Sequence, residues 1–128
     1  FRHYMAMAEV SPVPIMIYNV PGRTKSNIEW STTIRLANAS DKFIGIKEAS
    51  ADLIQATRII KNKPEGFIVT SGDDEVTLPM IAAGGDGVIS VIANATPGYS
   101  VNTIYKVKIM AGKSCGLPPE QPTCCLVI

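Results

Sequence analysis

The sequence predicts an α/β fold built around a parallel sheet, and three observations lead to that prediction. Four short runs are apolar at nearly every position, as strands buried on both faces are. Helical patterns separate these runs with short connections, and strict alternation of strands and helices is typical of parallel sheets. The 128 residues, of which 46% are hydrophobic, suffice for one folded core, and the net charge of +1 does not favour a nucleic-acid binder.

The first elements are a helix over residues 2–10 and a strand over residues 14–20, whose sequence is PIMIYNV. Pro14 bounds this strand on its amino-terminal side. Ser26 and Glu29, three residues apart, form a capping-box pattern. The pattern predicts that a helix begins there.

That helix is expected over residues 27–37, and a second strand and helix follow it over residues 43–49 and 51–63. The strand has the sequence FIGIKEA, which is strand-length rather than helix-length. Ser50 is placed to cap the second helix, and Pro64 is placed to end it.

The last elements repeat this order. Asp73 or Asp74 is placed to cap the next helix, and the glycine pair at residues 84–85 is placed to end it. The elements expected in this part are a strand over residues 67–71, a helix over 75–83, a strand over 87–93 and a weaker helix over 101–111.

Two architectures fit this alternation, namely an open doubly wound sheet and part of a (β/α)₈ barrel. A complete barrel needs about 250 residues, so four strands would form half of one. No Gly-x-Gly-x-x-Gly pattern follows the first strand, which weakens the interpretation as a dinucleotide-binding domain.

The cysteines bear on the compartment. All three, Cys115, Cys124 and Cys125, lie in the last fourteen residues, and an odd count at one end does not form a disulfide framework. They lack partners at zinc-ligand spacing, and His3 is the only histidine, so we expect no metal. No apolar run reaches the roughly 18 residues of a membrane helix. We therefore expect a cytoplasmic protein that does not bind membranes or nucleic acids.

Lys47 stands out, because a strand between apolar layers ordinarily excludes charge. The period of two puts Phe43, Gly45 and Lys47 on one face, where Gly45 would leave space beside the amine. Burial disfavours a charged amine and so favours its nucleophilic form, and barrel active sites lie at the carboxyl ends of strands. The alternative is a lysine that extends to water or pairs with Glu48 or Asp52.

Three further residues lie just at or after strand ends. Tyr18 occupies the equivalent place on the first strand, either as a proton donor to a substrate on Lys47 or as a core tyrosine whose hydroxyl has a partner. Arg23 follows a Pro-Gly turn, either as a clamp for a carboxylate or as a solvated loop arginine. Gly72 either lets the backbone approach a ligand or serves a turn before a helix.

Together these segments resemble the pyruvate-dependent Schiff-base class I aldolase and lyase family, which includes dihydrodipicolinate synthase and N-acetylneuraminate lyase. They keep the family's order and spacing from residue 1 to about residue 97. The matching segments are IYNVPGRT from residue 17, GIKEA from residue 45, SGDD from residue 71 and GGDGVIS from residue 84.

The resemblance implies a (β/α)₈ barrel, of which residues 1–97 would supply strands five to eight. Residues 98–128 would form a post-barrel helix and a divergent carboxyl-terminal tail. The resemblance also assigns roles to the residues singled out above. Lys47 would form an imine with pyruvate, Tyr18 would relay protons, and Arg23 would bind the carboxylate of L-aspartate 4-semialdehyde.

Gly72 and Ile89 match family positions that line the pyruvate pocket. The implied product is 4-hydroxy-tetrahydrodipicolinate, on the route to diaminopimelate and lysine, made by a homotetramer without metal or organic cofactor. The resemblance also places a threonine pair and a second relay tyrosine in a part of the family's sequence before residue 1. The alternatives are another pyruvate aldolase of the family, acting on N-acetylneuraminate or a 2-keto-3-deoxy sugar acid, and a half barrel that binds a ligand without turnover.

Overall fold

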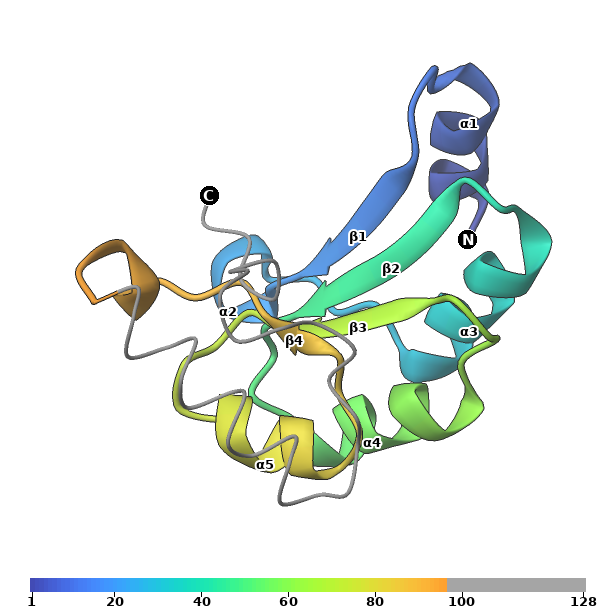
Figure 1. The fold of residues 1–128 in the computed structure, drawn as a ribbon. Coiled ribbons are helices and arrows are strands. Elements are labelled where there is room, and N and C mark those ends of the chain that lie inside the picture. The colour runs from blue at the N-terminus through green and yellow to red at the C-terminus, as the bar shows by residue number, and fades with distance from the viewer. Residues whose placement is uncertain (97–128) are drawn as a thin grey trace.

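The computed structural model describes residues 1–96, which form a four-stranded parallel sheet with helices packed along one face (Figure 1). The spatial order β1-β2-β3-β4 follows the sequence. A doubly wound sheet has helices on both faces and reverses its strand order at a switch point, so that alternative is wrong. The strands are β1 (Ile15–Asn19), β2 (Phe43–Glu48), β3 (Ile68–Ser71) and β4 (Gly87–Val88).

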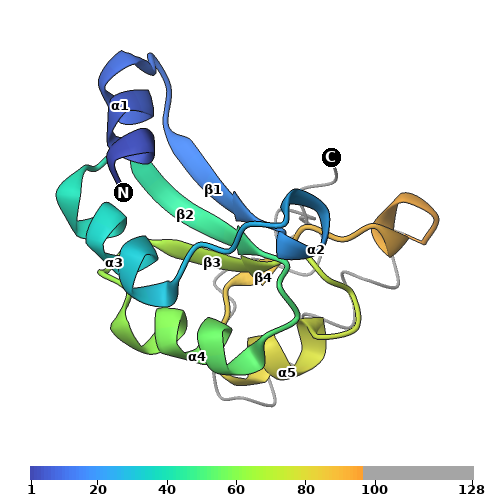
Figure 2. The ribbon, with the colours of Figure 1, turned by 180° about the vertical axis from the view of Figure 1, so that it is seen from behind.

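The α-helices lie close to where the apolar periodicity predicts them, with one unpredicted addition among them. Figure 2 shows α3, α4 and α5 side by side below the sheet, and α1 beside the amino-terminal end of β1. The addition is the short helix α2 at the carboxyl end of β1. The helices are α1 (Arg2–Val10), α2 (Pro21–Thr24), α3 (Trp30–Ala39), α4 (Leu53–Asn62), α5 (Thr77–Ala82) and the 3₁₀ turn η1 (Ile92–Asn94).

The last predicted strand is much shorter than expected, because β4 ends at Val88 and the chain then turns into η1. The helix predicted over residues 101–111 lies outside the described residues. Within residues 1–96, the helices are too short or too polar to traverse a lipid bilayer.

The start of α3 differs from the capping-box prediction. Glu29 occupies the N-cap position without a side-chain cap bond, and the helix begins three residues later than expected. The reason is that the preceding residues are held by tertiary bonds. The Ile28 amide donates to Asn19 Oδ1 at 3.1 Å, and Asn27 Nδ2 donates to Gln55 Oε1 at 3.2 Å. These bonds keep the segment extended, so the prediction that Ser26 opens a capping box is wrong.

The other two caps also differ from the prediction. Asp52, not Ser50, caps α4, accepting bonds from two backbone amides of its first turn at 2.9 and 3.0 Å. Neither Asp73 nor Asp74 caps α5, whose N-cap residue is Val76. The glycine stop is confirmed, because Gly84 has a φ of +115° directly after the helix, a conformation that side chains rarely adopt.

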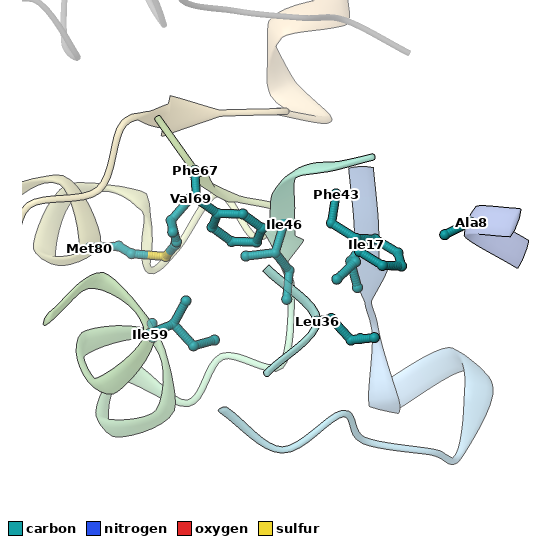
Figure 3. Close-up of a cluster of buried hydrophobic side chains, with 10 residues drawn as sticks. Ala8, Ile17, Leu36, Phe43, Ile46, Ile59, Phe67, Val69 and Met80 are labelled. Atoms are coloured by element: carbon teal, nitrogen blue, oxygen red, sulfur yellow. The ribbon is translucent and has the colours of Figure 1, made fainter. Parts of the chain in front are cut away.

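The core lies between the sheet and its helices (Figure 3). Phe43 belongs to this core, although strict alternation predicted that it shares a face with Lys47. The pairing of β1 with β2 jumps from Phe43 to Gly45, so Ile44 is an extra residue and the alternation is reset there. The cluster consists of Ala8, Ile17, Leu36, Phe43, Ile46, Ala56, Ile59, Phe67, Val69 and Met80.

Candidate active site

Lys47 is the second-last residue of β2 and projects from the face of the sheet opposite the core, because its neighbours Ile46 and Glu48 are buried. Its side chain is half-buried. Lys47 pairs with Tyr18 across the β1–β2 ladder, and its Nζ lies 4.3 Å from the centroid of the Tyr18 ring. A cation over the face of an aromatic ring is attracted by the ring quadrupole. The structure therefore joins the two residues predicted to carry the chemistry.

Gly72 gives the Lys47 side chain its space. A Cβ at Gly72 would lie 2.8 Å from Lys47 Cε, 2.9 Å from Lys47 Cγ and 2.8 Å from Ala49 Cβ. These separations are shorter than packed carbon atoms adopt, so the lysine can lie here only because residue 72 lacks a side chain. The Gly72 amide also donates to the Glu48 carbonyl at 2.8 Å, which fixes the turn after β3 against β2.

Gly45 acts differently from the prediction. It was expected to leave space beside the amine, but its Cβ would meet Ile68 O at 2.5 Å on the neighbouring strand. The glycine therefore permits the close approach of β3 to β2. Space for Lys47 comes from the next strand end instead.

Tyr18 is not a core tyrosine, because half of its surface is exposed. The alternative of a core tyrosine whose hydroxyl has a buried partner is therefore wrong. A cavity of about 370 Å³ is lined in part by Tyr18 and by its neighbour Asn19, and Tyr18 is the one predicted site residue among the described residues that line it.

Arg23 lies in α2, at the carboxyl end of β1, where its side chain is exposed. Arg23 thus lies at the same end of the sheet as Lys47, and within residues 1–96 its guanidinium makes no ion pair. Ile89 follows β4 and is buried, and its amide donates to Ser71 O at 2.8 Å. Ile89 thus lies beside the end of β3, one residue from Gly72.

A buried carboxylate, Glu48, forms a polar cluster that the sequence analysis did not predict. Glu48 was considered only as an ion-pair partner of Lys47, and that pairing is absent because adjacent strand residues face opposite ways. Its oxygens instead accept bonds from Asn19 Nδ2 at 3.0 Å and from Gln55 Nε2 at 3.1 Å. The available signal was Asn19 directly after Tyr18 and Glu48 directly after Lys47, on neighbouring strands.

The model of the Dihydrodipicolinate synthetase family matches residues 1–114. The chain belongs to this family. The 4-hydroxy-tetrahydrodipicolinate synthase of Flavobacterium psychrophilum is 54% identical over 97 residues, which are 76% of this chain and 33% of that relative. The chain therefore spans about a third of the length of the curated relatives it matches.

Solved structures of the family agree with the fold. A monomeric dihydrodipicolinate synthase variant has a TM-score of 0.73 and 34% identity, covering 87% of this chain and 41% of that one. The chloride-inhibited enzyme of Acinetobacter baumannii, complexed with pyruvate, has a TM-score of 0.74 and 36% identity, covering 87% of this chain and 39% of that one. These matches confirm the prediction that the four strands are part of a (β/α)₈ barrel.

Proposed function

We propose that the protein acts as a 4-hydroxy-tetrahydrodipicolinate synthase, in which Lys47 forms an imine with pyruvate. One observation carries the proposal. In a chain of this family, the half-buried Lys47 lies at the carboxyl end of a parallel strand, on the open face of the sheet. Parallel strands of barrels present their reactive groups at that end. The matched relatives bear the synthase name, which favours this reaction over the other pyruvate aldolases.

The chemistry follows from the amine. The Lys47 nitrogen attacks the carbonyl carbon of pyruvate, water leaves, and the resulting iminium draws electrons from the methyl group, which loses a proton to give an enamine. The enamine carbon then attacks the aldehyde carbon of L-aspartate 4-semialdehyde. The amino group of that substrate attacks the imine carbon, closes the ring and releases the Lys47 amine. Pyruvate and the semialdehyde thus give the product and one water molecule, without a metal or organic cofactor.

Neighbouring side chains would support these steps. The Tyr18 ring lies 4.3 Å from Lys47 Nζ, so its negative face would lie against the cationic iminium formed on that nitrogen. The exposed Tyr18 hydroxyl would carry protons to and from the substrate. Arg23 would bind the carboxylate of the semialdehyde, and the backbone at Gly72 and Ile89 would border pyruvate. A cytoplasmic location and a homotetramer remain expectations from the sequence.

Reductive trapping tests the proposal on the 128-residue chain. Pyruvate and borohydride should leave an adduct on the peptide that contains Lys47, and addition of the semialdehyde before reduction should release it. The adduct should vanish in Lys47→Ala and persist in the matched control Lys61→Ala, which changes an exposed lysine at the end of α4. Even labelling of all exposed lysines, or no adduct on a chain that circular dichroism shows to be folded, would contradict the assignment to Lys47.

A further inference from the structure

Glu48 is a buried carboxylate that no cation neutralises within residues 1–96. Its side chain is 2% exposed, and the ion pair in this part of the chain joins two other residues, Lys63 and Asp86. Burying a charge is costly unless hydrogen bonds compensate for the lost water. The cost is met by neutral donors, and residues 1–96 contain no buried side-chain polar atom without a partner. A buried carboxylate whose hydrogen bonds are all provided by neutral groups indicates a role for Glu48 beyond core packing.

The donors come from several separate segments that meet at one end of the sheet. Asn19 Nδ2, at the end of β1, lies 3.0 Å from each Glu48 oxygen. The Ser50 amide, in the turn after β2, donates to Oε1 at 2.8 Å, and Gln55 Nε2, in the first turn of α4, donates to Oε2 at 3.1 Å. The carboxylate therefore ties together the ends of two strands and the start of the helix behind them.

Asn27 completes the cluster from the loop before α3. Its Oδ1 accepts from Asn19 Nδ2 at 2.9 Å and from Gln55 Nε2 at 3.2 Å. Asn19 Oδ1 in turn accepts the Ile28 amide at 3.1 Å. Each amide side chain thus has both its donor and its acceptor occupied, which fixes its orientation.

The hydrogen-bonded residues Asn19 and Glu48 each lie one residue beyond Tyr18 and Lys47 on their strands. Tyr18 pairs with Lys47 across the ladder, and Asn19 pairs with Glu48 directly after them. The register of two strand ends is set by their last bonds, and here a bond between side chains reinforces the backbone ladder. A shift at the second pair would move the Tyr18 ring relative to Lys47 Nζ.

We propose that Glu48 is a positioning residue for Lys47: its buried carboxylate fixes the end of β2 against the end of β1 and so holds Lys47 over the Tyr18 ring. This inference rests on the proposed function for its effect on the reaction, but the geometry that it explains is independent of catalysis. It also explains why the residue is an acid. The three nearest groups are all donors, and an amide at this place would set its own NH₂ against one of them.

The test compares Glu48→Gln with Asp86→Asn. Both exchange a carboxylate for the corresponding amide. Like Glu48, Asp86 accepts a bond from a backbone amide, that of Val69 at 2.8 Å. Asp86 precedes β4, however, and so lies at the amino-terminal end of the sheet, away from Lys47. Two quantities are measured on the 128-residue chain. One is the NMR shift of the Lys47 ε-methylene protons, which the current of the Tyr18 ring displaces. The other is the rate of borohydride trapping with pyruvate at Lys47.

We expect Glu48→Gln to move the Lys47 ε-methylene resonance most of the way to its position in Tyr18→Leu, which lacks the ring. Trapping should slow by roughly tenfold to a hundredfold, since misplacing a reacting group by about 1 Å costs up to about 10²-fold. Asp86→Asn should lower the urea midpoint but leave both quantities near their original values. The double variant Asn19→Asp with Glu48→Gln, which reverses donor and acceptor, should recover part of the resonance shift.

Two results overturn the inference. One is a Lys47 resonance unchanged by Glu48→Gln in a folded chain, and the other is an equal change in Asp86→Asn. Failure of the proposed function looks different, since the unmodified chain would then give no Lys47 adduct while the resonance still responded to Glu48→Gln. The NMR measurement therefore decides the positioning role in every case.

Discussion

Gly72→Ala is the substitution for which the structure gives the clearest magnitude. The new Cβ would lie 2.8 Å from both Lys47 Cε and Ala49 Cβ, whereas ordinary contact begins at 3.4 Å, so neighbours must move by about 0.6 Å. The backbone itself permits alanine, because Gly72 does not have a positive φ. The strain therefore falls on the Lys47 stem and on Ala49.

The lysine stem can rotate toward solvent, so the loss of stability should be small and the loss of reactivity large. Overpacking costs about 1–3 kcal/mol, and we expect a decrease in the free energy of unfolding near the lower limit. Displacing the amine from its place over Tyr18 should slow trapping by pyruvate and borohydride by about tenfold, since a misplacement of about 1 Å can cost up to about 10²-fold. Urea unfolding and the rate of adduct formation on the Lys47 peptide measure the two effects.

Gly22→Ala is the matched control. It makes the same change in α2, at the same end of the sheet, but a Cβ there meets nothing within 4 Å. Both the urea midpoint and the trapping rate should stay close to those of the original chain. If Gly72→Ala traps pyruvate as fast as Gly22→Ala, the space at residue 72 does not position Lys47 and the reasoning is refuted.

Two further substitutions test the frame around the site by urea unfolding. Gly45→Ala places a Cβ 2.5 Å from Ile68 O, a backbone atom that cannot rotate away. The free energy of unfolding should therefore fall by about 3 kcal/mol, the upper range for overpacking, and a smaller decrease than in Gly72→Ala would contradict this. Asp52→Ala removes two cap bonds of α4 and should lower the free energy of unfolding by about 1 kcal/mol. Ser50→Ala should lower it by less, and a larger effect of Ser50→Ala than of Asp52→Ala would show that Ser50 caps the helix.

Most of the fold was predictable because its signals are local. Apolar runs of strand length identify the four strands, and the pattern between them identifies the helices. The caps were not predictable, because tertiary bonds decide them. Ser26 and Glu29 have the right spacing for a capping box, but Asn27 and Ile28 are already bonded to β1 and α4. A local pattern is overridden wherever a more distant partner offers a better bond.

The candidate site shows the same division. Parallel strands end at one edge of the sheet, so a lysine and a tyrosine at equivalent strand positions were expected to meet, and they do. The space that admits the lysine was assigned to Gly45, on the same strand, but it comes from Gly72 on the next one. Close approaches between strands depend on the twist and spacing of the sheet, which no single segment encodes.

Lys47 and Glu48 show that strand register, rather than proximity in sequence, decides which charged side chain lies on the open face of the sheet. They are adjacent in sequence, yet the pleat sends the amine to the open face and the carboxylate into the core. A slip of one residue would exchange them and bury the amine. Strict alternation from Phe43 would have placed that phenylalanine on the open face with Lys47. The extra residue Ile44 resets the alternation, so that one short strand can deliver an aromatic ring to the core and, four residues later, an amine to the opposite side.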